Sequence, residues 1–226
     1  MPSETSSLPK RRCILSRLRL AALVSGSGSN LQSIIDAIAE QSLPAEIVHV
    51  VASKHGLPAE ERAIRNQLSY TVVSRKEYNG NCEAMSAAIA DLLEPLAIDL
   101  ILLCGFLSFL SEAFVERYQG RIMNIHPSLL PAFGGRGAYG IRVHQAVIDY
   151  GAKISGCTVM FVDAGEDTGP IILQKALQVH QDETSQSLAD RVMQLENVAY
   201  PEAVLLFAEG RLHIDGRKVR IRERRT

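Results

Sequence analysis

The chain has 226 residues, of which 46% are hydrophobic and 22% charged, and its formal net charge is -1. This length and composition are ordinary for one globular domain, and no segment in the middle of the chain has the composition of a linker. The near-zero charge excludes a general attraction to nucleic acid or an acidic membrane, so we expect small-molecule partners.

The cysteines and histidines do not form the patterns of metal sites or disulfide frameworks. Cys13, Cys82, Cys104 and Cys157 are far apart without a CxxC pair, and the six histidines show no HExxH spacing. Thiols scattered in this way are typical of reduced intracellular proteins. We therefore expect a cytoplasmic protein with no metal, which is either a monomer or a homodimer.

The two ends of the chain differ from the middle. Residues 1–17 are predicted to form a flexible N-terminal extension, followed by a single domain over 18–226. An organellar transit peptide is the alternative for the start, because Glu4 is the only acidic residue among the first 19. The basic end RKVRIRERRT lacks interleaved aromatic residues, which favours a solvated tail over a nucleic-acid patch. No stretch approaches the ~20 apolar residues of a membrane span. We expect no nucleic-acid or membrane partner.

Apolar runs rich in β-branched residues alternate with segments of helical period along the first half of the chain. Strands are predicted at Leu18–Val24, Ile47–Ala52, Tyr70–Val73, Leu100–Leu103 and Ile122–Ile125, with helices at Leu31–Glu40, Glu60–Gln67, Cys82–Leu93 and Glu112–Tyr118. This alternation predicts an α/β fold, with a Rossmann-like, mostly parallel sheet covered by helices on both faces.

The rhythm changes after Pro131. The glycine-rich stretch AFGGRGAYG precedes a predicted helix at Val143–Tyr150, and two strands joined by a short loop, Cys157–Val162 and Ile171–Val179, predict a late antiparallel addition. A long C-terminal helix is predicted over Ser185–Glu209, tolerating or kinking at Pro201. The end of the chain predicts a hairpin that turns at Asp215-Gly216.

The first loop with functional character is SGSGSN, residues 25–30, between the first strand and the first helix. Glycines let backbone amides approach an anion, and a helix N-terminus adds donors and a favourable dipole. The GxGxxG dinucleotide pattern fails because Leu31 occupies its third glycine position, and a P-loop lysine is missing. We expect one phosphomonoester here, while a tight turn capped by Ser29 or Asn30 is the alternative.

The second loop follows the strand that contains NIHPSLLP. Asn124 and His126 are two residues apart, so their side chains share one face of that strand. Pro127 favours an extended conformation at His126, as expected at the end of a strand. Because ligands bind at the carboxyl ends of parallel strands, this pair is a candidate for function, with a structural strand end as the alternative.

The third loop is DAGEDTGP, residues 163–170, between the two late strands. Its carboxylates fit a solvated turn, but one that reached His126 would favour the imidazolium, orient the ring and relay a proton. The three loops contain no convincing nucleophile, since Ser128 is not in a GxSxG elbow. Direct transfer between two bound substrates is therefore expected, with Asn124 and His126 stabilising an oxyanion.

The segments VSGSGSNLQ, GFLSFLS, NIHPSLLP and DTGPIILQ together resemble the folate-dependent phosphoribosylglycinamide (GAR) formyltransferases, over roughly residues 18–210. The resemblance implies transfer of a formyl group from 10-formyltetrahydrofolate to the amine of GAR in purine biosynthesis, through a tetrahedral intermediate and without a metal. It places the catalytic residues at Asn124, His126 and Asp167.

The resemblance also implies two binding regions. The GAR phosphate and ribose fall on Ser27, Gly28, Ser29, Asn30 and Glu196. The folate falls on two segments and on Asn124; the segments comprise Leu107, Ser108, Phe109 and Leu110, and Asp163, Ala164, Gly165, Glu166 and Asp167.

The chain departs from the family pattern in three places. Ser108 stands where some members have Arg, and Met160 stands where many have His. The segment 132–142 is longer and richer in glycine than the corresponding segment of the shortest members.

Three other functions would fit parts of the pattern. A formyltetrahydrofolate deformylase or a methionyl-tRNA formyltransferase is expected to carry a further domain, which we do not expect here. The alternative from another class is a non-catalytic nucleotide-binding module, which would tolerate substitution of Asn124, His126 and Asp167.

Overall fold

The computed structural model describes residues 17–224, and the expected N-terminal extension lies almost entirely outside them. The strands are β1 (Leu18–Val24), β2 (Ala45–Ala52), β3 (Tyr70–Val72), β4 (Leu100–Cys104), β5 (Ile122–His126), β6 (Ile154–Phe161), β7 (Ile171–Gln178), β8 (Leu212–Asp215) and β9 (Lys218–Ile221). The helices are α1 (Ser29–Ala39), α2 (Pro58–Arg65), α3 (Cys82–Leu93), α4 (Glu112–Arg117), α5 (Ile141–Tyr150) and α6 (Ser185–Ala208), with short 3-10 turns η1 (Arg75–Tyr78) and η2 (Glu94–Leu96).

The strands form one sheet in the order β3-β2-β1-β4-β5-β6-β7-β9-β8. The five strands from β3 to β5 pair in parallel, whereas β6 pairs antiparallel with both β5 and β7. The predicted α/β class, parallel core, late antiparallel strands and long C-terminal helix are confirmed.

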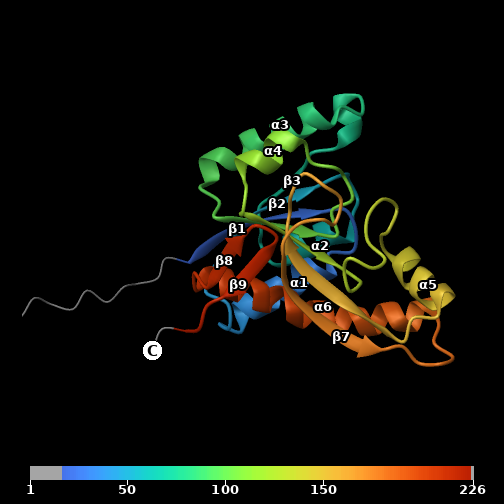
Figure 1. Ribbon diagram of the computed structural model, residues 1–226. Coiled ribbons are helices and arrows are strands. Elements are labelled where there is room, and N and C mark those ends of the chain that lie inside the picture. Colours follow the sequence, from blue (N-terminus) through green and yellow to red (C-terminus); the bar gives the residue numbers. More distant parts are fainter. Residues whose placement is uncertain (1–16, 225–226) are drawn as a thin grey trace, which may run out of the picture.

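Helices cover both faces of the sheet (Figure 1), and each face has its own apolar core. Side chains of α1, α2, α5 and α6 pack on one face around Leu31, Val147 and Tyr200. Side chains of α3 and α4 pack on the other around Ile89 and Phe114. The central strands β1 and β4 are therefore buried on both faces, which explains why their sequences are continuous apolar runs rather than alternating ones.

Two details differ from the predictions. Helix α1 begins at Ser29 rather than at Leu31, and its N-cap is Gly28 in the left-handed conformation (φ 73°) without a side-chain capping bond. The alternative that Ser29 or Asn30 caps this helix is therefore wrong, because a glycine makes the turn by its own backbone freedom. The terminal hairpin β8–β9 also joins the sheet beside β7, pairing Ile171 with Lys218.

The strand order reverses between β1 and β4, so the loops that leave these two strands diverge at the carboxyl edge of the sheet. This is the place where open α/β sheets bind ligands. Here the backbone N–H of Leu107, after β4, donates to the Ser25 hydroxyl, after β1, over 2.9 Å. The two loops are thereby fixed to each other at the edge where the functional residues were predicted.

Candidate active site

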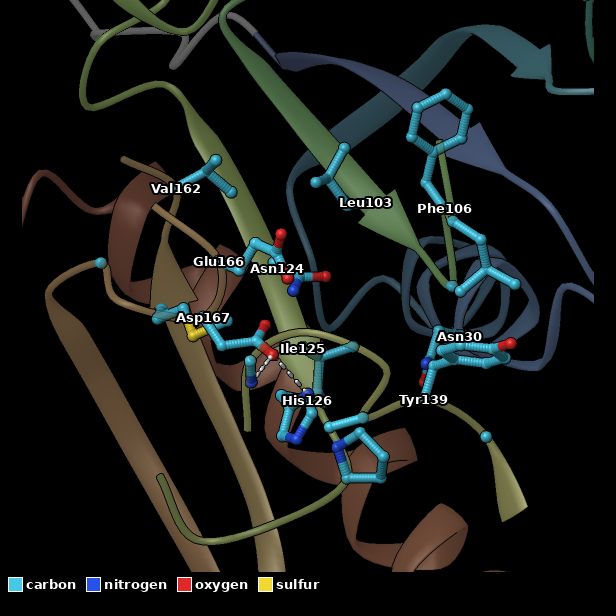
Figure 2. Close-up of a pocket in the computed structure, with 18 of the residues that line it drawn as sticks. Asn30, Leu103, Phe106, Asn124, Ile125, His126, Tyr139, Val162, Glu166 and Asp167 are labelled. Atoms are coloured by element: carbon cyan, nitrogen blue, oxygen red, sulfur yellow. Dashed lines mark hydrogen bonds and ion pairs between the residues drawn. The ribbon is translucent and has the colours of Figure 1, made fainter. Parts of the chain in front are cut away.

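A cleft of about 650 Å³ opens at the carboxyl edge of the sheet. Figure 2 shows Asn124, His126 and Asp167 on one side of it and Asn30 with Tyr139 on the other. Most of the predicted site residues line this cleft, including Ser29, Asn30, Leu107–Leu110, Asn124, His126, Asp163–Asp167 and Glu196. The chain thus brings together segments that lie more than a hundred residues apart.

Strand β5 presents Asn124 and His126 to the cleft on one face, as the two-residue spacing predicts. His126 is only 4% exposed, and its Nε2 lies 3.0 Å from the carbonyl oxygen of Phe133. A carbonyl oxygen can only accept, so Nε2 carries a proton in this arrangement. The ring nitrogen that is left for chemistry is therefore Nδ1.

The Asp167 carboxylate faces that nitrogen. Its Oδ2 lies 3.4 Å from His126 Nδ1 and also accepts the backbone N–H of Gly135 over 2.9 Å. Both interactions are drawn as dashed lines in Figure 2. Asp167 itself adopts a left-handed backbone conformation (φ 55°), which is uncommon for a residue with a side chain and is frequent at functional sites. One carboxylate thus joins the histidine to the glycine-rich segment 132–142.

Interactions within the loop between β6 and β7 fix its shape. The Asp163 carboxylate accepts from the backbone N–H of Gly165 over 3.1 Å and from the Thr168 hydroxyl over 2.7 Å. At the end of the loop, a Cβ on Gly169 would overlap the carbonyl oxygen of Phe161. Asp163 and Gly169 therefore stabilise the loop conformation that places Asp167 beside His126.

Replacing Gly169 by alanine should lower the free energy of unfolding by about 1–3 kcal/mol, because backbone has to move to admit the methyl group. Urea unfolding measures this loss. Gly26→Ala is the matched control, since a Cβ there meets no atom within 4 Å and the backbone φ is not positive. Equal stability of the two variants would contradict the crowding at Gly169.

The segment after His126 is structural. Ser128 is fully buried, and its hydroxyl donates to the Ala132 carbonyl over 2.6 Å. The Thr158 hydroxyl of β6 donates to the Ser128 carbonyl and accepts the N–H of Leu130, over 2.7 and 3.0 Å. These bonds fasten the SLLP segment to β6, and they leave Ser128 in no position to act as a nucleophile.

A buried polar pair lies on the opposite side of the cleft. Asn30, in the first turn of α1, and Glu196, on α6, are each 8% exposed, and Asn30 Nδ2 lies 3.5 Å from Glu196 Oε2. Burial raises the pKa of Glu196 to about 7, and the hydrogen bond from Asn30 opposes that rise. The Asn30 Oδ1 atom has no hydrogen-bond partner among residues 17–224. Such a pair is suited to hydroxyl groups of a ligand, which can both donate and accept.

Two of the predicted phosphate-loop residues do not line the main cleft. The Ser27 carbonyl accepts from the Arg62 side chain over 2.8 Å, and Gly28 forms the N-cap of α1 against Ala59 of α2. Ser29 and Asn30 do line it. The loop therefore faces the cleft with the first turn of α1, while its earlier residues rest on α2.

The predicted folate segment after β4 is apolar and open. Leu107 and Phe109 are 57% and 53% exposed, and they line the cleft together with Ser108 and Leu110. Exposed large apolar side chains beside a cleft are a common mark of a ligand surface. Met160, at the position where many family members have His, also lines the cleft and is buried at 2% exposure.

Two polar side chains are notable among the cleft residues that the sequence reasoning missed. Tyr139 lies in the glycine-rich stretch whose contacts the sequence did not reveal, and it lines the cleft on the side of Asn30 (Figure 2). His144, on α5, is 4% exposed, and its Nδ1 is buried without a partner in the described part of the chain. Burial is the main cause that lowers the pKa of His144, and the nearby His126 lowers this pKa further. The sequence did contain a signal for these two residues: Tyr139 stands between glycines just before α5, and His144 lies in the first turns of that helix.

Two classes of feature were also sought over residues 17–224. No group of three or more His, Cys, Asp or Glu side chains is placed to hold a metal ion. None of the helices in this range combines the length and apolar character that crossing a membrane requires.

Comparison with known proteins agrees with this geometry. The formyl transferase family model matches residues 18–204. A phosphoribosylglycinamide formyltransferase of Haemophilus influenzae is 38% identical over 196 residues, which are 87% of this chain and 90% of that protein. The crystal structure of glycinamide ribonucleotide transformylase 1 from Symbiobacterium toebii superposes with a TM-score of 0.86 at 39% identity, covering 92% of this chain and 95% of that one.

A longer relative matches over the same region. The trifunctional purine biosynthetic protein adenosine-3 of Bos taurus is 40% identical over 198 residues, which are 88% of this chain and 19% of that protein. The chain thus spans about a fifth of the length of this relative. The family model covers β1 to β7 and the loops of the cleft, and the relatives match most of the chain, so the resemblance drawn from the sequence motifs is confirmed. The chain belongs to the formyl transferase family, among its phosphoribosylglycinamide formyltransferases.

Proposed function

We propose that this chain transfers a formyl group from 10-formyltetrahydrofolate to the amine of 5'-phosphoribosylglycinamide, as a step of purine biosynthesis. The observation that carries the proposal is the meeting of Asn124, His126 and Asp167 in one cleft, opposite the buried pair Asn30–Glu196. The two sides of the cleft give room for two substrates, and Ser128, whose hydroxyl donates to the Ala132 carbonyl, is not placed to form a covalent intermediate.

The acceptor substrate binds on the side of α1 and α6. The first turn of an α-helix has backbone N–H groups without intrahelical acceptors, so Ser29 and Asn30 are placed to bind a phosphate. The Glu196 carboxyl and the unpartnered Asn30 Oδ1 accept hydrogen bonds from ribose hydroxyls. The amine of the acceptor then points across the cleft toward β5.

The folate binds on the side of β4 and the 163–167 loop, and it supplies an activated formyl carbon. Leu107 and Phe109 offer exposed apolar surface that its aromatic rings can cover. The backbone of residues 107–110 and 163–167 supplies polar groups along the same wall. Ser108 adds a short hydroxyl and no charge, so binding at residues 107–110 rests mainly on backbone and apolar contacts.

The residues of β5 act on the charge that develops during transfer. When the acceptor amine bonds to the formyl carbon, the carbonyl oxygen gains negative charge, which the Asn124 amide and the His126 Nδ1–H stabilise by hydrogen bonding. Phe133 holds the other ring nitrogen, so the ring is oriented in advance. Asp167 holds the positive charge of the ring and passes the amine proton to the departing folate nitrogen, directly or through water.

The decisive experiment incubates the protein with 10-formyltetrahydrofolate, with and without GAR, and follows folate deformylation. We expect deformylation only when GAR is present, and the amount of folate deformylated should equal the amount of GAR formylated. Equal rates without GAR would identify a hydrolase instead. The absence of any reaction, with both ligands bound, would identify a non-catalytic binding module.

The same proposal includes the setting of the enzyme. Its partners are these two small molecules, and its place is the cytoplasm. In support, the Cys104 and Cys157 thiols are buried and free, and burial raises the pKa of the Cys157 thiol to about 12, so that it stays protonated and unreactive.

A further inference from the structure

The main cleft has an electrostatic imbalance. In the described part of the chain, the residues that line it include five carboxylate side chains and neither lysine nor arginine; the carboxylates are Glu112, Asp163, Glu166, Asp167 and Glu196. A phosphate group carries up to two negative charges, and backbone N–H groups alone provide only partial positive charge. A substrate with a phosphate therefore needs a cation close to, but outside, the lining of this cleft.

The candidate for this cation is Arg62, on α2. A second groove runs between α1, α2 and α6 and shares Ser29 with the main cleft. Among the described residues that line the groove, Arg62 is the only lysine or arginine. Asp36 lies about two turns farther along α1 and Glu40, its C-cap, about three turns farther, so an anion in the groove is favoured at the Ser29 end, beside Arg62.

Contacts with the phosphate loop hold the guanidinium in place. Arg62 Nε donates to the Ser27 carbonyl over 2.8 Å, and Nη1 donates to Gln32 Oε1 over 3.1 Å. Arg62 Cδ also lies 3.3 Å from the position that a Cβ on Gly28 would occupy, so this glycine allows α2 to approach the loop closely. A guanidinium has more N–H donors than these two contacts use, and the remaining ones are available to an anion at the helix N-terminus.

An independent observation points to a polar ligand at the same helix end. Asn30, in the first turn of α1, is more than nine-tenths buried and faces the cleft, and its Oδ1 has no partner among residues 17–224. A buried amide oxygen without a partner costs free energy unless a ligand or water satisfies it. The first turn of α1 thus has both a charge for a phosphate and an unpaired acceptor for the group attached to it.

We propose that Arg62 is the phosphate-recognising cation of this protein: it binds the 5'-phosphate of the acceptor from the α2 side while it fixes the Ser27 carbonyl of the loop. The inference rests on the proposed function for the identity of the acceptor. It adds a specificity residue from α2, an element that the loop motif SGSGSN does not include. The arginine selects phosphorylated acceptors over their dephosphorylated forms.

The test compares Arg62→Gln with Arg65→Gln, a control on the same helix at an exposed position. Arg62→Gln should raise KM for GAR by about 10- to 100-fold, as expected when a charged hydrogen-bond partner is lost, while KM for 10-formyltetrahydrofolate changes less than twofold. Arg62→Lys should recover part of the loss. Arg65→Gln should match the unsubstituted protein in both constants.

A binding measurement keeps this inference separate from the proposed function. Titration calorimetry with ribose 5-phosphate should give a dissociation constant about 10- to 100-fold higher for Arg62→Gln than for Arg65→Gln. That result without any formyl transfer would reject the proposed reaction and keep the role of Arg62. Equal dissociation constants for the two variants, or a loss that falls on kcat with no change in KM for GAR, would overturn the role of Arg62.

Discussion

Replacing His126 by alanine should lower kcat for formyl transfer on the order of 10²–10³-fold while the protein stays folded. The side chain is nearly buried, yet its Nδ1 faces the cleft and Asp167, whereas its Nε2 is held by the Phe133 carbonyl. The alanine variant therefore loses the hydrogen-bond donor for the developing oxyanion. Single-turnover kinetics with saturating GAR and 10-formyltetrahydrofolate measure the loss at the chemical step.

The matched control for His126 is His213→Ala, at an exposed position on β8. It should turn over at the rate of the unsubstituted protein. Unreduced single-turnover rates in a folded His126→Ala variant would remove His126 from the mechanism. Asp167→Asn tests the same arrangement from the other side, and it should also lower kcat, because an amide does not stabilise the positive charge of the ring as a carboxylate does.

Replacing Glu196 by glutamine should stabilise the protein at alkaline pH and weaken GAR binding. Burial raises the pKa of Glu196 to about 7 from the ordinary 4.5, so the folded state keeps this proton over a range in which the unfolded chain releases it. The contribution of Glu196 to stability is therefore full below pH 4.5 and is lost as the pH rises toward 7 and above. The difference between the two pKa values corresponds to about 3 kcal/mol.

Urea unfolding at several pH values checks this expectation. The gain from Glu196→Gln should be small near pH 4.5 and should grow to about 3 kcal/mol at pH 8. Glu116→Gln, at an exposed position on α4, should show no such trend. A gain that does not change with pH would contradict the burial of an ionising carboxyl group. GAR affinity should fall in the same variant, because a carboxylate that accepts from the ribose is replaced by a neutral amide.

These two residues also show what could be predicted from the sequence. The sequence predicts that Asn124 and His126 share one face and one edge, because strand periodicity is local and the carboxyl ends of parallel strands meet at one side of the sheet. Glu196 came only from the resemblance to the formyltransferases. Nothing local in a helix of 24 residues distinguishes a glutamate that becomes buried from one that stays in solvent.

Contacts made by the backbone or by distant segments could not be predicted in this way. The Phe133 carbonyl that fixes the His126 ring belongs to the backbone, so this contact cannot be predicted from the type of residue at position 133. Arg62 contacts the phosphate loop because α2 packs against that loop. Tyr139 lines the cleft because of how the glycine-rich segment folds. The sequence places the start of α1 two residues too late because serines and glycines favour loops in general, whereas Gly28 here forms the N-cap of the helix.

The sequence by itself determined the order of strands and helices, the parallel core, the polar pair on β5 and the family, because periodicity, turn residues and motifs are properties of short segments. Only the tertiary structure decided which nitrogen of His126 faces Asp167, that Asn30 lies beside Glu196, and that Arg62 supports the phosphate loop. The physical reason is that these contacts join residues from 7 to 166 positions apart. Their distances are fixed by how helices pack on the sheet, not by any local preference of the chain.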